Sequence, residues 1–572
     1  MKFEGAPDIA EYVKKEIYPD GLEYVPLREN RVAVRVAPED LTKVAELFVK
    51  KYEARLIHAT AVDLEFKGFE VLHIYDFSKK RDRLVVVVKA LVEKDNPEIP
   101  SIANITWQAA WAEKEMKELL GINPLGTPDP RHQFLPYEWP NPVESGSIPE
   151  GNKFETPASA TQTKEMYLPL RMPIEEAYQS LIPIGPYHPG VIEGQIVYVK
   201  VEGEQVVAAD IKTGFHHRGI MKLIEQRGYN KGAFIAERVC GICSAAHGLA
   251  YITCTENLYE AEVPDRALYI RTLLVELNRI HSHLLWIGVV ADVIGWKTGF
   301  MLTWGLRERV MDIIEAITGN RVNYGIWRMG GVSRDVSQEL AEKAKRTVDN
   351  LKEECAKLLA LVAEHPVVKS RLIGVGPLTK AQAFDGGAVG PVARASNWKI
   401  DVRADNPPHA IYDPKIVSWE VITDDHCDTY GRTLVRVKEL LVSCGIVSQC
   451  LEYLAKTTGE IRIKPKSVPA GAEAVGLNEA PRGELAYYIR ASDTDANLPH
   501  SIRIRTPSYR NNAIIPLMLV GSNLADVPVV MGSTDQCLAC TDRVEVINEK
   551  DGTRKSLTWD QLINLSRRAS RC

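Results

Sequence analysis

The sequence predicts an α+β protein in which a small N-terminal α/β module is joined by a linker to a larger, mainly helical domain. Three observations indicate this: valine-rich runs near the N-terminus, a proline-rich stretch without hydrophobic periodicity, and long apolar repeats at helical spacing beyond it. The expected boundaries are residues 1–138 for the first module, 139–172 for the linker, 173–543 for the large domain and 544–572 for a C-terminal extension.

The N-terminal module is predicted from two strand-like runs with a helix between them. Residues 31–36 and 84–88 are rich in valine, which favours strands. Between them, residues 41–51 carry leucine, valine and phenylalanine three and four positions apart, directly after an acidic pair. That spacing and that start are typical of a short amphipathic helix.

The large domain is predicted to be built around long buried helices. From residue 267 to residue 285, isoleucine and leucine recur every three or four positions, and Pro264 with Asp265 makes a suitable helix start. Residues 338–364 show the same period with charged outer positions, whereas residues 195–207 favour a strand. We therefore expect a helical bundle with a small amount of sheet.

The composition excludes several classes of protein. The chain has 572 residues, of which 45% are hydrophobic and 25% charged, so it is neither disordered nor fibrous. Its net charge of −5 offers no basic excess for binding nucleic acid. No apolar run reaches the ~20 residues that a spanning helix needs, and the N-terminus lacks a signal-peptide pattern. Ten cysteines are too few for a disulfide scaffold, so we expect a reducing, cytoplasmic location.

Two Cys-x-x-Cys pairs stand at opposite ends of the predicted large domain. Cys240 and Cys243 form the first pair, and Cys537 and Cys540 form the second. A two-residue gap lets both sulfurs of a pair turn toward one metal. A zinc ribbon holds its two pairs roughly 15–20 residues apart, and these pairs are much farther apart in sequence. On spacing alone, a redox metal centre, a structural zinc site and plain buried thiols all remain open.

The residues around these cysteines resemble two motifs of a known enzyme family. Residues 238–247 read Arg-Val-Cys-Gly-Ile-Cys-Ser-Ala-Ala-His, and residues 533–543 read Ser-Thr-Asp-Gln-Cys-Leu-Ala-Cys-Thr-Asp-Arg. Both are similar to the cysteine motifs of the large, catalytic subunit of nickel–iron (NiFe) hydrogenases, specifically of the group 4, membrane-associated enzymes related to respiratory complex I. Gln536 departs from the family pattern, in which proline is usual at this position.

The resemblance extends over most of the chain. Residues 217–220, 328–332 and 387–391 are similar to segments that this group shares with the 49 kDa-type subunit of complex I, and residues 100–122 resemble its 30 kDa-type subunit. Fusion of these two modules is typical of formate hydrogenlyase-type hydrogenases. The resemblance therefore implies a complex I 30 kDa-like α/β domain followed by a hydrogenase large-subunit, 49 kDa-like domain.

By this resemblance, the four motif cysteines hold a nickel–iron centre. Cys240 and Cys537 would be terminal nickel ligands, while Cys243 and Cys540 would bridge nickel to an iron that carries CO and cyanide. Thiolates are soft ligands that suit both metals. The family also implies that Cys537 accepts a proton when H2 is cleaved. Because no further cysteines have cluster spacing, we expect no Fe–S cluster in this chain.

Four further residues match positions that the family uses around the metals. His247 would donate a hydrogen bond to a bridging sulfur, and Glu193 would transfer protons. Arg482 would lie over the open face of the metals, and Ser533 would hydrogen-bond a cyanide. Without the family, these residues would be interpreted as a core histidine, a surface glutamate, a salt-bridging arginine and a helix or loop cap.

Two departures from the family and the C-terminal residues lead to further expectations. Met221 and Arg543 stand where the standard uptake enzymes bind a third metal, so we expect no third metal. Ile192 stands where complex I has a quinone-binding histidine, which argues against quinone chemistry. Mature family members end at the residue matching Arg543, so residues 544–572 are expected to be a precursor tail that an endopeptidase removes. The alternative is a permanent structural extension.

The sequence thus predicts the catalytic subunit of a multi-subunit, energy-converting hydrogenase that reversibly converts protons and electrons into H2 and is expected to evolve H2. Expected partners are an Fe–S small subunit, membrane-arm subunits, an electron-donor module (formate dehydrogenase, carbon monoxide dehydrogenase or ferredoxin), a maturation endopeptidase and nickel chaperones, but no nucleic acid. The chain would be peripheral on the cytoplasmic side of the membrane. The competing hypotheses are a complex I-like or sulfur-reducing oxidoreductase subunit and a non-catalytic assembly subunit with structural zinc.

Overall fold

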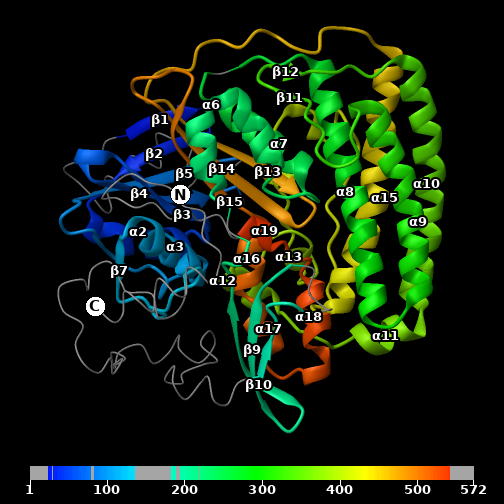
Figure 1. Cartoon of the computed structure of the whole chain (residues 1–572), viewed down its shortest axis with the longest axis horizontal. Coiled ribbons are helices and arrows are strands. Elements are labelled where there is room, and N and C mark those ends of the chain that lie inside the picture. The colour runs from blue at the N-terminus through cyan, green and yellow to red at the C-terminus, as the bar shows by residue number, and fades with distance from the viewer. Residues whose placement is uncertain are drawn as a thin grey trace.

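A computed structural model of the chain (Figure 1) has a sheet-containing N-terminal module and a mainly helical second domain, which confirms the predicted fold class. The described residues are 24–28, 30–78, 83–135, 182–188, 193–216, 218–259 and 261–541, with the backbone alone described for 24–28. The predicted linker at residues 139–172, Arg543 and the extension at 544–572 lie outside them.

The N-terminal module is a five-stranded mixed sheet of order β1-β2-β5-β4-β3, in which β2 and β5 are parallel. Its strands are β1 (Tyr24–Arg28), β2 (Arg31–Arg35), β3 (Arg55–Asp63), β4 (Phe69–Asp76) and β5 (Val85–Val92), with the short pair β6 (Glu98–Pro100) and β7 (Asn123–Leu125) beside it. Its helices are α2 (Leu41–Ala45) and α3 (Ala110–Leu120). Both predicted strands are confirmed, and the predicted helix begins as α2 but continues as a π-type turn over Glu46–Lys51.

Long helices dominate the second domain, where α8, α9, α10 and α15 form a bundle (Figure 1). The helices are α6 (Ile220–Glu237), α7 (Ser244–Asn257), α8 (Asp265–Val293), α9 (Lys297–Thr318), α10 (Gln338–Glu364), α11 (Pro366–Leu372), α12 (Lys380–Gly386), α13 (Pro391–Arg394), α14 (Val402–Asp405), α15 (Thr429–Lys456), α16 (Pro507–Ala513), α17 (Ile515–Leu519), α18 (Val527–Ser533) and α19 (Leu538–Thr541). The predicted helix start at Asp265 and the predicted helix at 338–364 are confirmed. Among the described helices, none is both long enough and apolar enough to cross a bilayer.

The second domain also contains more sheet than the sequence indicates. Its strands are β8 (Ile182–Ile184), β9 (Ile196–Glu202), β10 (Gln205–Lys212), β11 (Trp327–Arg328), β12 (Gly331–Val332), β13 (Glu473–Ala480), β14 (Gly483–Ala491) and β15 (Pro499–Arg505). The single strand predicted at 195–207 is a hairpin, β9–β10. The sheet β13-β14-β15 was not predicted, because buried polar residues such as Asn478 and Glu479 interrupt its apolar pattern.

Both faces of the N-terminal sheet are buried, which explains the unbroken valine run in β5. Successive strand residues point to opposite faces. Val86 and Val88 share a core with α2 and α3, whereas Val85 and Val87 share a core with Tyr488 of β14. Strands that are buried on both faces are apolar without alternation. The second domain therefore covers the face of the N-terminal sheet that lies opposite α2 and α3.

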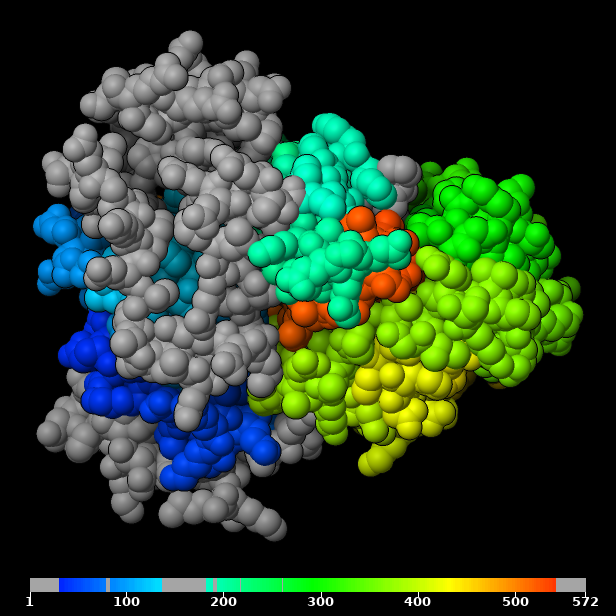
Figure 2. Space-filling model, turned by 90° about the horizontal axis from the view of Figure 1, so that it is seen from below, coloured from blue at the N-terminus to red at the C-terminus, as the bar shows by residue number. Residues whose placement is uncertain are grey.

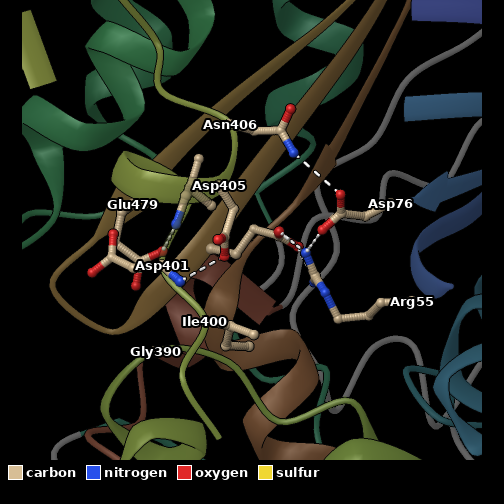
Figure 3. Close-up of a pocket in the computed structure, with 10 residues that line it drawn as sticks. Arg55, Asp76, Gly390, Ile400, Asp401, Asp405, Asn406 and Glu479 are labelled. Carbon is tan, nitrogen blue, oxygen red and sulfur yellow. Dashed lines mark hydrogen bonds and ion pairs between the residues drawn. The ribbon is translucent and has the colours of Figure 1, made fainter. Parts of the chain in front are cut away.

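Buried ion pairs join the two modules beside a small polar cavity (Figure 3). Arg55 of β3 donates to Glu484 of β14 (Nη1–Oε1 2.7 Å) and to Asp76 of β4 (Nη2–Oδ2 2.8 Å). Arg505 of β15 pairs with the same Glu484 carboxylate. Asn406 reaches Asp76 from the second domain (Nδ2–Oδ1 3.1 Å). Because these buried groups are paired with one another, removal of one partner would leave a buried charge uncompensated.

Helices α16 and α19 lie near the centre of the molecule, between the N-terminal sheet and the bundle, with α17 and α18 below them in this view (Figure 1). Hairpin β9–β10 packs against them, as the neighbouring cyan-green and red atoms in Figure 2 show. Val206 of β10 exchanges backbone hydrogen bonds with Gly521 and Ser522, both at 2.8 Å. The segment that leads into β9 also contacts this region, since the Glu193 carboxylate accepts from Ala539 N–H (2.8 Å).

Candidate metal centre

The two cysteine pairs meet in one buried cluster. Cys240 and Cys243 lie in the turn between α6 and α7, and Cys537 and Cys540 lie at α19. The Cys537 sulfur is 3.3 Å from that of Cys240 and 3.1 Å from that of Cys540. The sulfurs of Cys240, Cys537 and Cys540 all lie within 4.8 Å of one another. The two pairs, which lie at opposite ends of the second domain in the sequence, thus form one set of candidate ligands.

Cys243 completes the cluster from the other side. Its backbone N–H donates to the Cys240 sulfur (3.1 Å), and its own sulfur accepts from Arg482 (Nη1–Sγ 2.9 Å). Cys240, Cys243 and Cys540 are each 1% exposed and Cys537 is 3% exposed. None of the four forms a disulfide.

The donor set fits a soft metal centre. Burial raises the pKa of the Cys540 thiol well above its usual range, whereas hydrogen bonds from Cys243 and the other thiols lower that of Cys240. The protein alone therefore does not favour four thiolates at once. A bound cation would compensate them, and four sulfur ligands suit nickel with iron and equally suit zinc.

His247 lies one helical turn after Cys243 in α7 and reaches the second pair. Its Nε2 is 3.6 Å from the Cys540 sulfur, and its Nδ1 is 2.7 Å from the hydroxyl of Tyr487 in β14. Sequence reasoning missed Tyr487 as a partner of His247, because a buried strand tyrosine carries no local signal. It orients the imidazole as partners of metal-site histidines do.

Arg482, at the β13–β14 turn, is held against the cluster by Asp535. Its Nε donates to the Asp535 carbonyl and its Nη2 to the Asp535 carboxylate, both at 2.6 Å, which leaves Nη1 on Cys243. Asp535 adopts a positive φ of 56° at this position. Asp535 was not predicted as a site residue, although it lies inside the second motif.

Glu193 lies in the segment that leads into β9 and touches the second motif. Its Oε2 accepts from the backbone N–H of Ala539 at 2.8 Å. The carboxylate is therefore placed next to the loop that carries Cys537 and Cys540. Ile192 lies outside the described residues.

Ser533 ends α18, and both hydrogen-bonding functions of its hydroxyl have protein partners. The hydroxyl donates to the Val530 carbonyl (2.6 Å) and accepts from Arg432 (Nε–Oγ 2.9 Å). No described contact joins it to a cysteine sulfur. Met221 is buried in α6.

Two hydroxyl residues at the start of α16 hold the second motif in place and were also missed. The Ser508 hydroxyl accepts from the Cys537 N–H (3.0 Å), and the Thr506 hydroxyl donates to the Cys540 carbonyl (3.1 Å). The sequence Thr506-Pro507 is a typical helix start and could have located this turn. Its proximity to the cysteines depends on the tertiary fold.

Three family models match the chain. The model described as respiratory-chain NADH dehydrogenase, 49 Kd subunit, matches residues 293–469 and 461–543. The model of the 30 Kd subunit matches residues 34–149. The model described as nickel-dependent hydrogenase matches residues 218–289, which include the first cysteine pair.

Known proteins are similar over large parts of the chain. "Formate hydrogenlyase subunit 5" of Escherichia coli is 31% identical over 488 residues, covering 85% of this chain and 84% of its own length. "Membrane-bound hydrogenase subunit alpha" of Pyrococcus furiosus is 37% identical, covering 68% of this chain and 93% of its own length. A solved structure described as a membrane-bound sulfane sulfur reductase, an archaeal respiratory membrane complex, has a TM-score of 0.60 at 30% identity and covers 65% of this chain and 100% of its own.

Proposed function

This chain belongs to the family of group 4, membrane-associated NiFe hydrogenase large subunits, with a complex I 30 kDa-like domain fused to a 49 kDa-like domain, and on that premise we propose that it is the catalytic subunit of a multi-subunit, energy-converting hydrogenase. The proposed reaction is the reversible conversion of two protons and two electrons into H2. The observation that carries it is the buried cluster in which the sulfurs of Cys240, Cys537 and Cys540 lie within 4.8 Å of one another, with Cys243 bonded to Cys240 through its backbone N–H.

The cysteine cluster would hold nickel and iron. In this proposal Cys240 and Cys537 would be ligands of nickel, and Cys243 and Cys540 would be ligands of both nickel and an iron that carries CO and cyanide. When bound, this centre supplies the two-electron chemistry of heterolytic H2 cleavage. Soft thiolates suit both metals, and the buried site excludes water that would compete for them.

Two side chains of the protein, Cys537 and Glu193, would bind and transfer the proton. The Cys537 sulfur holds the proton, and Glu193 passes it onward from its position on the Ala539 N–H. A carboxylate can act in this way when it lies within hydrogen-bonding reach of the donor, directly or through one water. With Tyr487 donating to Nδ1 of His247, Nε2 keeps its hydrogen and can donate to the Cys540 sulfur.

Arg482 would provide the fixed positive charge of the site. Asp535 takes two of its donor groups, so the guanidinium cannot turn away from Cys243. A pre-oriented cation of this kind stabilises negative charge without reorganising. Ser533 would hydrogen-bond a cyanide ligand. Its hydroxyl also accepts a hydrogen bond from Arg432.

Electrons would reach the site from partner subunits. We propose an Fe–S small subunit as the immediate donor, with formate, carbon monoxide or ferredoxin as the original source. Membrane-arm subunits would hold the chain at the cytoplasmic side of the membrane; two similar proteins are described as membrane-bound.

The C-terminal residues would be removed during maturation. We propose that an endopeptidase cuts after Arg543 once nickel chaperones have delivered the metal. Mass spectrometry of the active complex tests this: a chain ending at Arg543 supports it, and an active, metal-containing chain of full length refutes it.

H2 production by the intact complex tests the proposed reaction. With a chemically reduced viologen as donor, the wild-type complex should evolve H2 and the Cys537→Ala complex should not. The relevant alternative is sulfur reduction, because one similar structure is a sulfane sulfur reductase. Reduction of polysulfide without any H2 evolution would replace the proposal by that alternative.

A further inference from the structure

Two side-chain amides tie the second cysteine motif to the segment that carries Glu193. The Gln195 amide nitrogen donates to Oε1 of Gln536. Gln536 donates in return to Oε1 of Gln195 (3.3 Å) and to Oδ1 of Asn512 in α16 (3.2 Å). Gln195 is completely buried. Gln536 is only partly buried, so it is the Gln195 amide that would lose its partner without replacement by water.

Gln536 is the position at which this chain departs from the family motif. Proline would restrict the backbone before Cys537 through its ring, but it carries no side-chain donor or acceptor. Glutamine leaves the backbone less restricted, and its side-chain amide supplies both a hydrogen-bond donor and an acceptor. In this chain, the residue before Cys537 is thus held by hydrogen bonds to the side chain of Gln195, which belongs to another segment.

The same short segment is anchored at three successive residues. Glu193 accepts from Ala539 N–H (2.8 Å), Gly194 N–H donates to Nε2 of His216 (2.7 Å), and Gln195 pairs with Gln536. The first and third anchors both lie on the second motif. Together they fix the Glu193 carboxylate relative to the loop that carries Cys537.

We propose that Gln195 and Gln536 are a positioning pair that holds Glu193 against the second cysteine motif for proton transfer. This inference rests on the proposed function, because it assigns the pair to that proton route. Proton transfer requires hydrogen-bonding distance. A displacement of 1 Å at a reacting group can cost a factor of about 100 in rate.

Methionine variants of the intact complex test the pair, because methionine resembles glutamine in shape and lacks the amide. We expect Gln536→Met to keep nickel and iron, to lower H2 turnover about 10- to 100-fold and to raise the solvent deuterium isotope effect. Hydrogen exchange at the Ala539 amide, which reports the Glu193 contact directly, should become faster. Gln449→Met is the matched control, because that amide bonds Ser418 on the outer side of α15, and it should match wild type in all measurements.

A double variant separates positioning from a general structural effect. In the Glu193→Gln background, Gln536→Met should produce no further loss of turnover, because the group it positions is already inactive. The same fractional loss in both backgrounds would overturn the proposal. So would wild-type exchange at the Ala539 amide in Gln536→Met. If the wild-type complex contains no nickel or evolves no H2, the proposed function fails, and the exchange measurement still decides whether the amide pair holds the contact.

Discussion

Two buried polar clusters in this molecule differ in how their charge is compensated. At the contact between the modules, two carboxylates and two guanidinium groups pair with one another: Arg55 with Glu484 and Asp76, and Arg505 with Glu484. In the cysteine cluster, the described contacts include one guanidinium for four sulfurs, that of Arg482, and it donates to the Cys243 sulfur.

The difference indicates which cluster serves stability and which serves chemistry. An ionic cluster that pairs its own charges needs no ligand and loses stability when one partner is removed. Arg482 carries a single positive charge, which it shares between the Asp535 carboxylate and Cys243, so it cannot by itself neutralise four thiolates. Buried thiolates therefore require a further cation. Changes at the two clusters should have effects of different kinds, on stability in one case and on metal and activity in the other.

Removal of a cysteine sulfur should have the largest effect. We expect Cys537→Ala to reduce H2 turnover to background and to abolish nickel binding, because Cys537 would be both ligand and proton acceptor. Metal analysis and H2 assays measure both. Cys254→Ala is the control: it removes a buried thiol that bonds a strand carbonyl (Sγ–O 3.3 Å) outside the cluster, and it should keep the metals. Full nickel content in Cys537→Ala would contradict the assignment.

Glu193→Gln separates proton transfer from metal binding. The amide keeps an oxygen that can accept from Ala539 N–H but cannot carry a proton. We expect unchanged nickel and iron with turnover lower by about 100-fold or more. Glu202→Gln, at the exposed end of β9, should leave turnover at the wild-type level. If turnover persists in Glu193→Gln, the proton route is wrong.

At the module contact, Glu484→Gln should reduce stability by about 3–5 kcal/mol, because it leaves buried guanidinium groups without their carboxylate. Thermal unfolding should show the loss, and the nickel content of the folded fraction should not change. Loss of nickel without loss of stability would contradict the division between the two clusters.

The same carboxylate predicts a dependence on pH. Burial alone would raise the pKa of Glu484, but the charges of Arg55 and Arg505 lower it from 4.5 to about 2. Its contribution to stability is therefore complete above pH 4.5 and is lost as the pH falls toward 2. Across this window, the free energy of unfolding should change more strongly with pH in the wild type than in Glu484→Gln.

The smallest effect should come from an ion pair exposed to water. Lys50 and Glu46 form such a pair at 3.2 Å, with side chains 62% and 57% exposed. We expect Lys50→Met to change stability by less than about 0.5 kcal/mol, since solvent screens the pair. A loss of stability as large as that of Glu484→Gln would show that burial does not determine how much an ion pair contributes to stability.

Local elements were predictable from the sequence where a periodic pattern extends over many residues. The bounds of α10 and the start of α8 follow from apolar spacing and helix-start residues, and the valine runs identify β2 and β5. The family resemblance is confirmed by the relatives. The sheet β13-β14-β15 was missed, since its strands carry polar residues that are satisfied only by distant partners.

The partners of the site residues were less predictable, because tertiary contacts bring them together. Asp535 and Tyr487 act through Arg482 and His247, which are distant from them in sequence. Gln536 was recognised as a departure from the family pattern, but its partner Gln195 is known only from the fold. The roles of the predicted site residues remain predictions for the experiments above.

Infrared spectroscopy of the mature complex, combined with metal analysis, tests most directly whether the four cysteines hold a nickel–iron centre. The account predicts equal amounts of nickel and iron together with absorption bands of iron-bound CO and cyanide, all absent from Cys537→Ala. Zinc alone, without those bands, would contradict it.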